Sequence, residues 1–275
     1  MKNIFDNHNH CEFSFDGKRT SIEKSSRAAA KMGLGGLCFT DHNDIYAPDY
    51  TISHNIHATD QLDIEAQQKE IDRVQELLPE IKILKGIEIG MHELCCEEAR
   101  QLIKSNSFDQ VIGSIHYVGD TDPYFGGYYE GKDWKTAYGG YLETLCTEMK
   151  RLEDFDIMGH YDYIVRYWDY EQTDILYKDF SDIFDEMFRY LIENGKALEI
   201  NTKSYQNFNG RQSGLDLDVL LRYKEMGGEI ISFGSDSHDD FHVGLEFAKY
   251  VALVRSLGFR WCAHYEKRKL VQLPL

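Results

Sequence analysis

The chain of 275 residues has little of what marks membrane, secreted or disordered proteins. No run of about 18 apolar residues occurs, so no membrane-spanning helix is expected. The first ten residues, MKNIFDNHNH, lack the apolar core of a signal peptide. The six cysteines form no C-x-x-C pair, which is typical of reduced thiols rather than of a disulfide framework. We therefore expect a cytoplasmic protein.

Positive charge is also scarce, because 30 Lys and Arg residues face 47 Asp and Glu residues and the net charge is −17. Such a surface repels polyanions, so no nucleic-acid partner is expected. A small phosphorylated substrate remains compatible with this charge, because bound cations can reverse the local sign. The composition leaves the oligomeric state open.

Strand-like and helix-like segments alternate about seven times, with only four prolines and no low-complexity linker. The expected strands are 3–8, 35–41, 81–89, 110–117, 155–162, 196–202 and 229–236, and the expected helices are 21–33, 63–78, 93–105, 141–154, 182–195, 216–228 and 247–259. This alternation predicts an α/β fold with a parallel sheet. A closed TIM-like barrel collects residues from all strands more easily than an open doubly wound sheet, which remains the alternative.

Residues of metal-ligand type stand at the ends of nearly all these strand-like runs. They are His8, His10, His42, Glu88, His116, His160, Asp236 and His238. The carboxyl ends of barrel strands meet at one face, so these side chains should share a pocket. Imidazole and carboxylate without thiolate suit several divalent ions that carry out hydrolysis, and Zn, Fe and Mn all remain open.

Spacing and neighbours support the same interpretation. His8 and His10 are one residue apart in an extended segment, so both side chains point to one face and can hold a metal together. Asp236 and His238 repeat this spacing after the last strand. Glu88 lies between Ile87 and Ile89, where a carboxylate is costly unless it is paired or bound to metal.

The order HxH, DH, strand Glu, two strand-end His and DxH resembles the PHP (polymerase and histidinol phosphatase) superfamily from residue 6 to about 240. The resemblance implies a distorted (β/α)7 barrel in a single metallohydrolase domain, residues 1–275, with three divalent metal ions. It implies that His8, His10, Glu88 and Asp236 hold the first ion, that Glu88, His116 and His160 hold the second, and that Asp16, His42 and His238 hold the third.

Asp16 stands where many superfamily members have His, and Asp16 followed by Gly17 resembles the histidinol-phosphatase branch. That branch implies a phosphomonoester hydrolase acting on L-histidinol phosphate in histidine biosynthesis. A hydroxide bridging two ions would be its nucleophile, with Glu88 as the bridging ligand. Asp236 or His238 could protonate the leaving alcohol.

Several residues near the strand ends are candidates for substrate contacts or for support of the ligands. Arg166, Arg211, Lys203 and Arg19 are candidate phosphate ligands, and Tyr124, Tyr128 and Tyr129 are candidate stacking partners for a substrate imidazole. Glu199 and Asn201 could hydrogen-bond the ligands. His92 could face the pocket, His54 and His57 are expected not to be ligands, and His242 and His264 are expected on a helix or the surface. The long loops 43–61 and 118–141 are candidate lids.

Three other functions remain open. The first is a phosphoesterase acting on nucleotides, oligonucleotides or phosphotyrosine. The second is a metal-dependent amidohydrolase, which usually has a lysine where this chain has Glu88. The third is a non-catalytic metal-binding module, although every expected ligand position is filled.

Overall fold

The computed structural model describes residues 1–48, 62–208 and 210–275, so His54 and His57 lie outside the described residues. Its centre is a nearly closed barrel of parallel strands. In chain order these are β1 (Phe5–Asn9), β2 (Gly36–Phe39), β4 (Lys82–Gly90), β5 (Gln110–Ser114), β6 (Ile157–Met158), β7 (Ala197–Asn201) and β10 (Ile231–Gly234). The expected α/β, distorted (β/α)7 barrel is therefore confirmed.

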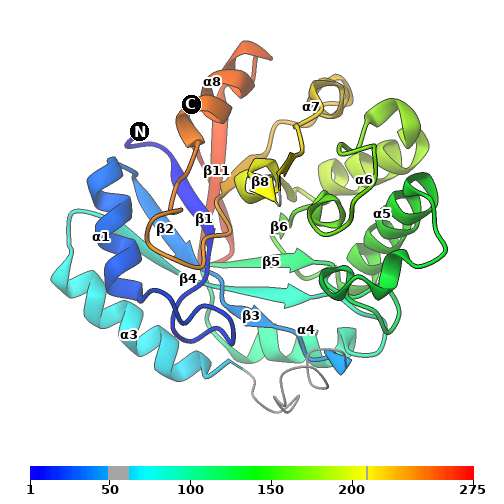
Figure 1. Ribbon diagram of the computed structural model, residues 1–275. Helices are drawn as coiled ribbons and strands as arrows, with labels where there is room; N and C mark the ends of the chain where they lie inside the picture. The colour runs from blue at the N-terminus through cyan, green and yellow to red at the C-terminus, as the bar shows by residue number, and fades with distance from the viewer. Residues whose placement is uncertain (49–61, 209) are drawn as a thin grey trace.

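Helices surround the barrel, with α1 and α3 on one side of Figure 1 and α5 and α6 on the other. They are α1 (Ile22–Met32), α3 (Ile64–Leu77), α4 (Cys96–Ser105), α5 (Trp134–Leu152), α6 (Ser181–Glu193), α7 (Leu217–Glu225) and α8 (Phe247–Ser256). The Ser21 side chain accepts a hydrogen bond from the Lys24 N–H at the start of α1, and Gly33 ends that helix at φ 74°. None of the helices in the described ranges is long and apolar enough to cross a membrane.

The helix expected at 141–154 begins earlier, at Trp134, where the Asp133 side chain accepts a hydrogen bond from the Thr136 N–H. Gly139 and Gly140 lie inside this helix and weaken its helical signal. They allow close packing, because a Cβ at Gly140 would lie 3.1 Å from the Tyr128 hydroxyl. The second candidate lid therefore ends near residue 133.

A C-terminal hairpin, which the sequence did not predict, packs against the barrel. It consists of β11 (Trp261–Glu266) and β12 (Lys269–Pro274), and the ring of His264 stacks on Phe5 at 3.8 Å. His264 is thus buried in a strand, which corrects its expected place on a helix or the surface. The turn of the hairpin places Lys267 and Arg268 at φ 51° and 62°, where Gly or Asn would be usual.

The barrel has a seam between β1 and β10. Among the described residues no regular ladder joins these strands, and an isolated parallel bridge pairs Asn9 with Ser237, three residues beyond the end of β10. The Asp6 carboxylate holds the seam by accepting hydrogen bonds from the Ser235 N–H and hydroxyl and from the Gly244 N–H. Above it, the Asp236 N–H donates to the His8 carbonyl at 2.8 Å. The short elements β3 (His42–Asn43), β8 (Asn207–Phe208), β9 (Arg211–Gln212), η1 (Pro123–Phe125), η2 (Gly127–Tyr129), η3 (Tyr163–Arg166), η4 (Tyr177–Asp179) and η5 (Thr202–Tyr205) lie in the connections.

Candidate metal centre

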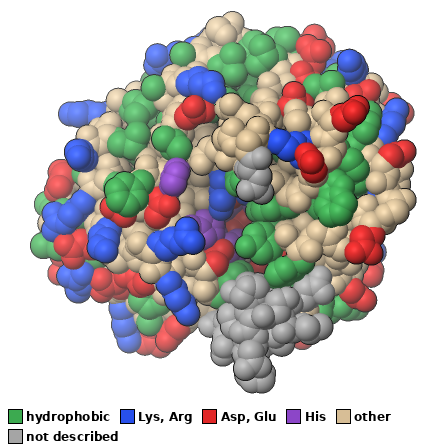
Figure 2. All heavy atoms as spheres, in the orientation of Figure 1, with side chains coloured by type: hydrophobic (Ala, Val, Ile, Leu, Met, Phe, Trp, Pro, Cys, Tyr) green, Lys and Arg blue, Asp and Glu red, His purple; other side chains and the backbone are tan. Residues whose placement is uncertain are grey.

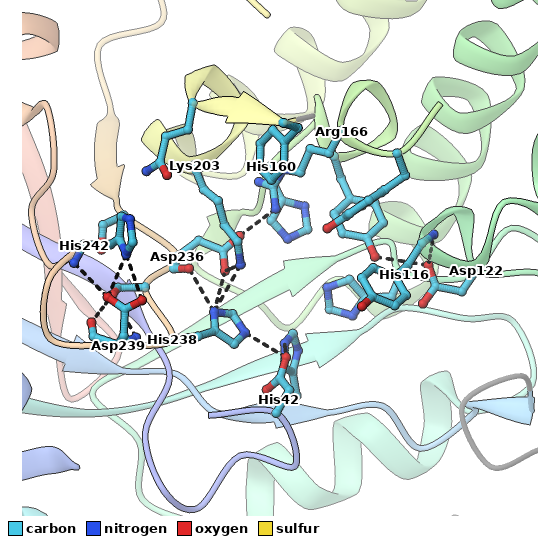
Figure 3. Close-up of a pocket in the computed structure, with 18 of the residues that line it drawn as sticks. His42, His116, Asp122, His160, Arg166, Lys203, Asp236, His238, Asp239 and His242 are labelled. Carbon is cyan, nitrogen blue, oxygen red and sulfur yellow. Dashed lines mark hydrogen bonds and ion pairs between the residues drawn. The ribbon is translucent and has the colours of Figure 1, made fainter. Parts of the chain in front are cut away.

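The expected ligands come together at the carboxyl ends of the strands. His8 lies in β1, His10 follows it, His42 lies in β3 and Glu88 lies in β4. His116 and His160 each come two residues after a strand, β5 and β6, and Asp236 and His238 follow β10. Figure 3 shows His42, His116, His160, Asp236 and His238 converging on one pocket. In the space-filling view, histidine side chains are visible inside a hollow of this face (Figure 2).

Glu88 lies at the centre of this cluster and is fully buried. Its two oxygens lie within 3.5 Å of imidazole nitrogens from five histidines. Oε2 lies 2.9 Å from His42 Nδ1, 3.2 Å from His8 Nε2 and 3.5 Å from His10 Nε2, and Oε1 lies 3.1 Å from His160 Nε2 and 3.3 Å from His116 Nε2. One carboxylate therefore faces five imidazoles from four strand ends, as a bridging metal ligand must.

Asp236 extends the cluster on the side of the seam. Its Oδ1 lies 3.5 Å from His10 Nε2 and accepts a hydrogen bond from Lys203 Nζ at 3.0 Å. Its backbone adopts φ 50°, a left-handed conformation that Asp tolerates better than most residues. Gly234, two residues before Asp236, leaves space for the Glu199 side chain, because a Cβ at this position would lie 2.1 Å from Glu199 Oε1. The turn after β10 therefore aims both Asp236 and His238 into the pocket.

Asp16 joins the cluster from the loop after β1. Its Oδ2 lies 2.8 Å from His238 Nε2 and 3.5 Å from His42 Nε2. Ligand atoms of His10, Asp16, His42 and His238 lie within 4.8 Å of one another. Asp16 came only from the family resemblance, and the structure places it beside the two histidines with which it was grouped.

A further layer of contacts orients the ligands. Glu199 Oε1 lies 2.8 Å from His8 Nδ1, and its other oxygen accepts the His160 N–H at 2.7 Å. Asp44 Oδ1 lies 2.8 Å from His116 Nδ1. Such carboxylates set the tautomer and the ring orientation of ligand histidines. The role expected for Glu199 fits this geometry. Sequence reasoning missed Asp44, although it stands two residues after His42 in the same run.

The charges around Glu88 favour the ionised form of its carboxylate. Burial raises the pKa of Glu88, but the surrounding imidazoles, first of all His8, hold it well below its usual value. Burial lowers the pKa of His8, yet Glu88 and Glu199 hold it well above that of an ordinary imidazole. Burial and neighbouring imidazoles hold the pKa of His10 well below its usual value. Buried ionisable groups packed this closely need compensating charge.

The cluster fits divalent ions on a separate observation. Several of its buried atoms have no hydrogen-bond partner among the described residues, namely His8 Nε2, both ring nitrogens of His10, His42 Nδ1, His116 Nε2 and Glu88 Oε2. Buried polar atoms normally have partners. These imidazole nitrogens and carboxylate oxygens are atoms that bind zinc, iron and manganese. Because they lie close together without hydrogen-bond partners, they are available to coordinate such ions.

The cluster forms one wall of a cavity of about 720 Å³. Three of the four candidate phosphate ligands, Arg166, Lys203 and Arg19, line this cavity. Arg211 does not line this cavity, so its expected role as a phosphate ligand is corrected. Its guanidinium donates to the carbonyls of Trp168 and Tyr170 and lies 3.1 Å from Asp169, so it holds a loop together.

The prediction that three tyrosines could stack on a substrate imidazole is partly wrong. Tyr124 lines the cavity, but Tyr128 and Tyr129 are buried in the core, where their hydroxyls donate to the carbonyls of Ala137 and Ile164. Loop 118–133 folds back on α5, which explains why two of its three tyrosines turn inward.

The prediction that His92 faces the pocket is wrong, whereas His242 lies at the surface as expected. His92 is not among the residues lining the cavity, and its Nε2 lies 3.1 Å from the Gly119 carbonyl. His242 does line the cavity, with its Nδ1 2.7 Å from Asp239 Oδ1. The signal for His242 was its place four residues after His238, in the same loop.

Comparison with known proteins agrees with this geometry. The PHP domain family matches residues 6–203. A histidinol-phosphatase of Lactococcus lactis is 34% identical over 98% of this chain and 97% of its own length. A probable histidinol-phosphatase of Clostridium acetobutylicum is 30% identical over 96% of this chain and 98% of its own length.

A crystal structure with the same fold supports the relationship. It is the histidinol phosphate phosphatase of Lactococcus lactis in complex with zinc, L-histidinol and phosphate. The two folds match with a TM-score of 0.86 at 30% identity, covering 98% of this chain and 99% of the other. The chain therefore belongs to the PHP domain family.

Proposed function

We propose that this protein is a metal-dependent phosphomonoester hydrolase that converts L-histidinol phosphate and water to L-histidinol and phosphate, a reaction of histidine biosynthesis. The observation that carries the proposal is Glu88, a buried carboxylate faced by five imidazoles, three of which, His42, His116 and His160, line the cavity. The relative of known structure binds zinc, L-histidinol and phosphate and matches nearly the whole chain. We further propose that residues 1–275 act as one domain in the cytoplasm.

Three divalent ions are proposed, with zinc, iron and manganese as candidates. The first would be held by His8, His10, Glu88 and Asp236, the second by Glu88, His116 and His160, and the third by Asp16, His42 and His238. The count of three rests on the family resemblance. Among the described residues the ligand atoms fall into four overlapping groups, which are His8, His10 and Asp236; His8, Glu88 and His160; His42, Glu88 and His116; and His10, Asp16, His42 and His238, so neighbouring ions would share ligands. Bound ions would activate water and neutralise phosphoryl oxygens.

The phosphate is proposed to lie between the metal ligands and three cationic side chains. Lys203 is partly exposed and lies beside Asp236 and His238, so its ammonium can reach a phosphoryl oxygen. Arg166 is nearly fully buried and holds Asp236 in place while lining the cavity. Arg19 lines the outer part of the cavity.

The leaving alcohol needs a proton, and His238 is the proposed donor. Asp236, the other candidate, pairs with Lys203 and Arg166, and although burial raises its pKa these cations hold the pKa well below its usual value, so it is ionised. The His238 ring is tied on both sides, because Nδ1 lies 3.0 Å from the Asp236 carbonyl and Nε2 lies 2.8 Å from Asp16. These contacts hold its ring at the cavity wall. Glu88 completes the proposed catalytic set by joining the first two ion positions.

The test is phosphate release by metal-reconstituted protein from L-histidinol phosphate, a nucleotide monophosphate, phosphotyrosine and an aryl phosphate. We expect kcat/KM for L-histidinol phosphate to exceed the others by about 100-fold and to vanish on chelation. Faster turnover of another ester would overturn the proposed substrate. Absence of phosphate release from all four would overturn the proposed reaction.

A further inference from the structure

Behind the metal ligands, Asp41 makes a buried contact with Cys11 and Gln67. All three residues are 0% exposed and lie outside the cavity lining. The Cys11 N–H donates to Asp41 Oδ1 at 2.7 Å, and the Cys11 thiol donates to Oδ2 at 2.8 Å. The Gln67 side-chain amide donates to the same Oδ2 at 2.6 Å. A buried carboxylate with donors on both oxygens is fixed in position and direction.

The members of this contact come from three different parts of the barrel. Cys11 follows β1, Asp41 follows β2, and Gln67 lies in the first turn of α3, which lies beside α1 outside the barrel (Figure 1). Cys11 and Asp41 each stand next to an expected metal ligand, because His10 precedes Cys11 and His42 follows Asp41. The contact therefore joins two ligand-bearing loops to each other and to a surrounding helix.

Cys11 also supports the turn that presents Asp16. The Ser14 N–H donates to the Cys11 carbonyl at 3.0 Å, and the Ser14 hydroxyl donates to Asp16 Oδ1 at 2.7 Å. Gly17 lies against the same carbonyl, because a Cβ there would lie 2.0 Å from the Cys11 oxygen. The turn is packed on Cys11, so a shift of Cys11 would move Asp16, whose Oδ2 faces the ligand histidines.

Other contacts hold the ligands of the neighbouring ion positions. The His10 N–H donates across the seam at 2.8 Å, and the Glu88 N–H donates to the Asp41 carbonyl at 3.2 Å. Both are backbone contacts that do not involve the Asp41 side chain. Loss of a donor to the Asp41 carboxylate should therefore leave His10 and Glu88 in place and loosen Asp16 and His42, which are two of the three ligands proposed for the third ion.

We propose that Cys11, Asp41 and Gln67 form a positioning unit that sets the affinity of the third ion, an inference that rests on the ion positions of the proposed function. The unit acts through the ligands and not by contact with the substrate. It holds Asp16 Oδ2 and His42 Nε2 at 3.5 Å from each other, where one ion can bind both. Metal ligands owe part of their affinity to such outer contacts.

Stepwise removal of zinc from the loaded protein by a competing chelating dye, with elemental analysis, measures the affinity of each ion. Asp16→Ala identifies the step of the third ion, because it removes one proposed ligand. Cys11→Ala and Gln67→Met each remove one donor to Asp41. In both, this step should weaken by about 10-fold and the other steps by less than about threefold. No weakening, equal weakening of every step, or an Asp16→Ala titration that matches the wild type overturns the proposal.

Matched variants separate the hydrogen bonds from packing. Cys38→Ala removes another fully buried thiol, from β2, and Gln75→Met removes an amide of α3 that bonds backbone carbonyls instead of Asp41. Both should lower the thermal midpoint without changing the zinc titration. Cys11→Ser keeps a donor and should bring the third step to within about threefold of the wild type. Equal weakening in the two controls, or no recovery with serine, overturns the proposal.

Zinc binding and phosphate release can fail independently, so this proposal and the proposed function are distinguishable. If the wild type binds zinc but releases no phosphate from any of the four esters, the proposed reaction fails. A third step that is weaker in Cys11→Ala still supports the positioning unit in that case. If the wild type is active and the Cys11→Ala and Gln67→Met titrations match it, the proposed function stands and the positioning unit is overturned.

Discussion

The guanidinium of Arg166 donates from Nη1 to Oδ2 of Asp236 at 2.8 Å, and both side chains are almost fully buried. Its Nε and Nη2 donate to the Ser204 hydroxyl at 3.1 and 2.9 Å. A buried ion pair leaves an uncompensated charge when one partner is removed, which typically costs about 3–5 kcal/mol. Arg166 therefore holds the Asp236 side chain in place.

Arg166→Met should thus lower the free energy of unfolding by about 3 kcal/mol in urea titrations. Arg222→Met is the matched control, because Arg222 pairs with Asp185 at a partly exposed position and should cost less than about 1 kcal/mol. Equal costs for the two variants would contradict the structural role given to Arg166.

Glu199→Gln tests the carboxylate behind His8. The substitution keeps the shape but removes the charge that faces His8 Nδ1, so the imidazole is a poorer ligand. We expect metal affinity or kcat/KM to fall by about 10- to 100-fold, measured by competition with a chelating dye and by phosphate release. Glu148→Gln changes a buried carboxylate outside the cavity lining and should leave both unchanged.

Glu88→Gln should remove the common ligand of two proposed ions. Elemental analysis is expected to show fewer bound ions per chain than in the wild type, and phosphate release should fall by about 100-fold or more. Retention of the full metal content would contradict the central position assigned to Glu88.

Chelation should lower the thermal midpoint of the wild type by several degrees, because ions that bind only the folded state stabilise it. The Glu88→Gln protein should respond less to the chelator. Differential scanning fluorimetry with and without added zinc measures both. Identical responses would show that the stabilising ions bind elsewhere.

The barrel and the metal ligands could be predicted because each signal is local. A buried strand that ends in His or Glu is visible in the chain, as in the segments of Glu88 and His160, and parallel strands bring their ends together. Asp16 needed the family resemblance, because it lies in a loop with no periodicity. All nine proposed ligands lie in one cluster, but which ion each binds stays a prediction.

The failures come from contacts that depend on tertiary packing. Tyr124 and Tyr128 look alike in the sequence, yet one lines the cavity and the other packs on α5. Arg211 follows a strand but bonds loop carbonyls instead of facing the pocket. The C-terminal hairpin was not predicted, because its turn has Lys267 and Arg268 at positive φ instead of the Gly or Asn that usually indicates a hairpin turn.

The seam between β1 and β10 links metal binding to barrel closure. His8 and His10 stand on one edge of the seam, and Asp236 and His238 stand on the other. An ion held by both edges would act as a cross-link where the regular ladder is missing. In metal-poor medium the amides of β1 and β10 should therefore exchange with deuterium first, while β4 and β5, which are paired on both sides, stay protected. Metal supply would then set the lifetime of the closed barrel as well as its chemistry.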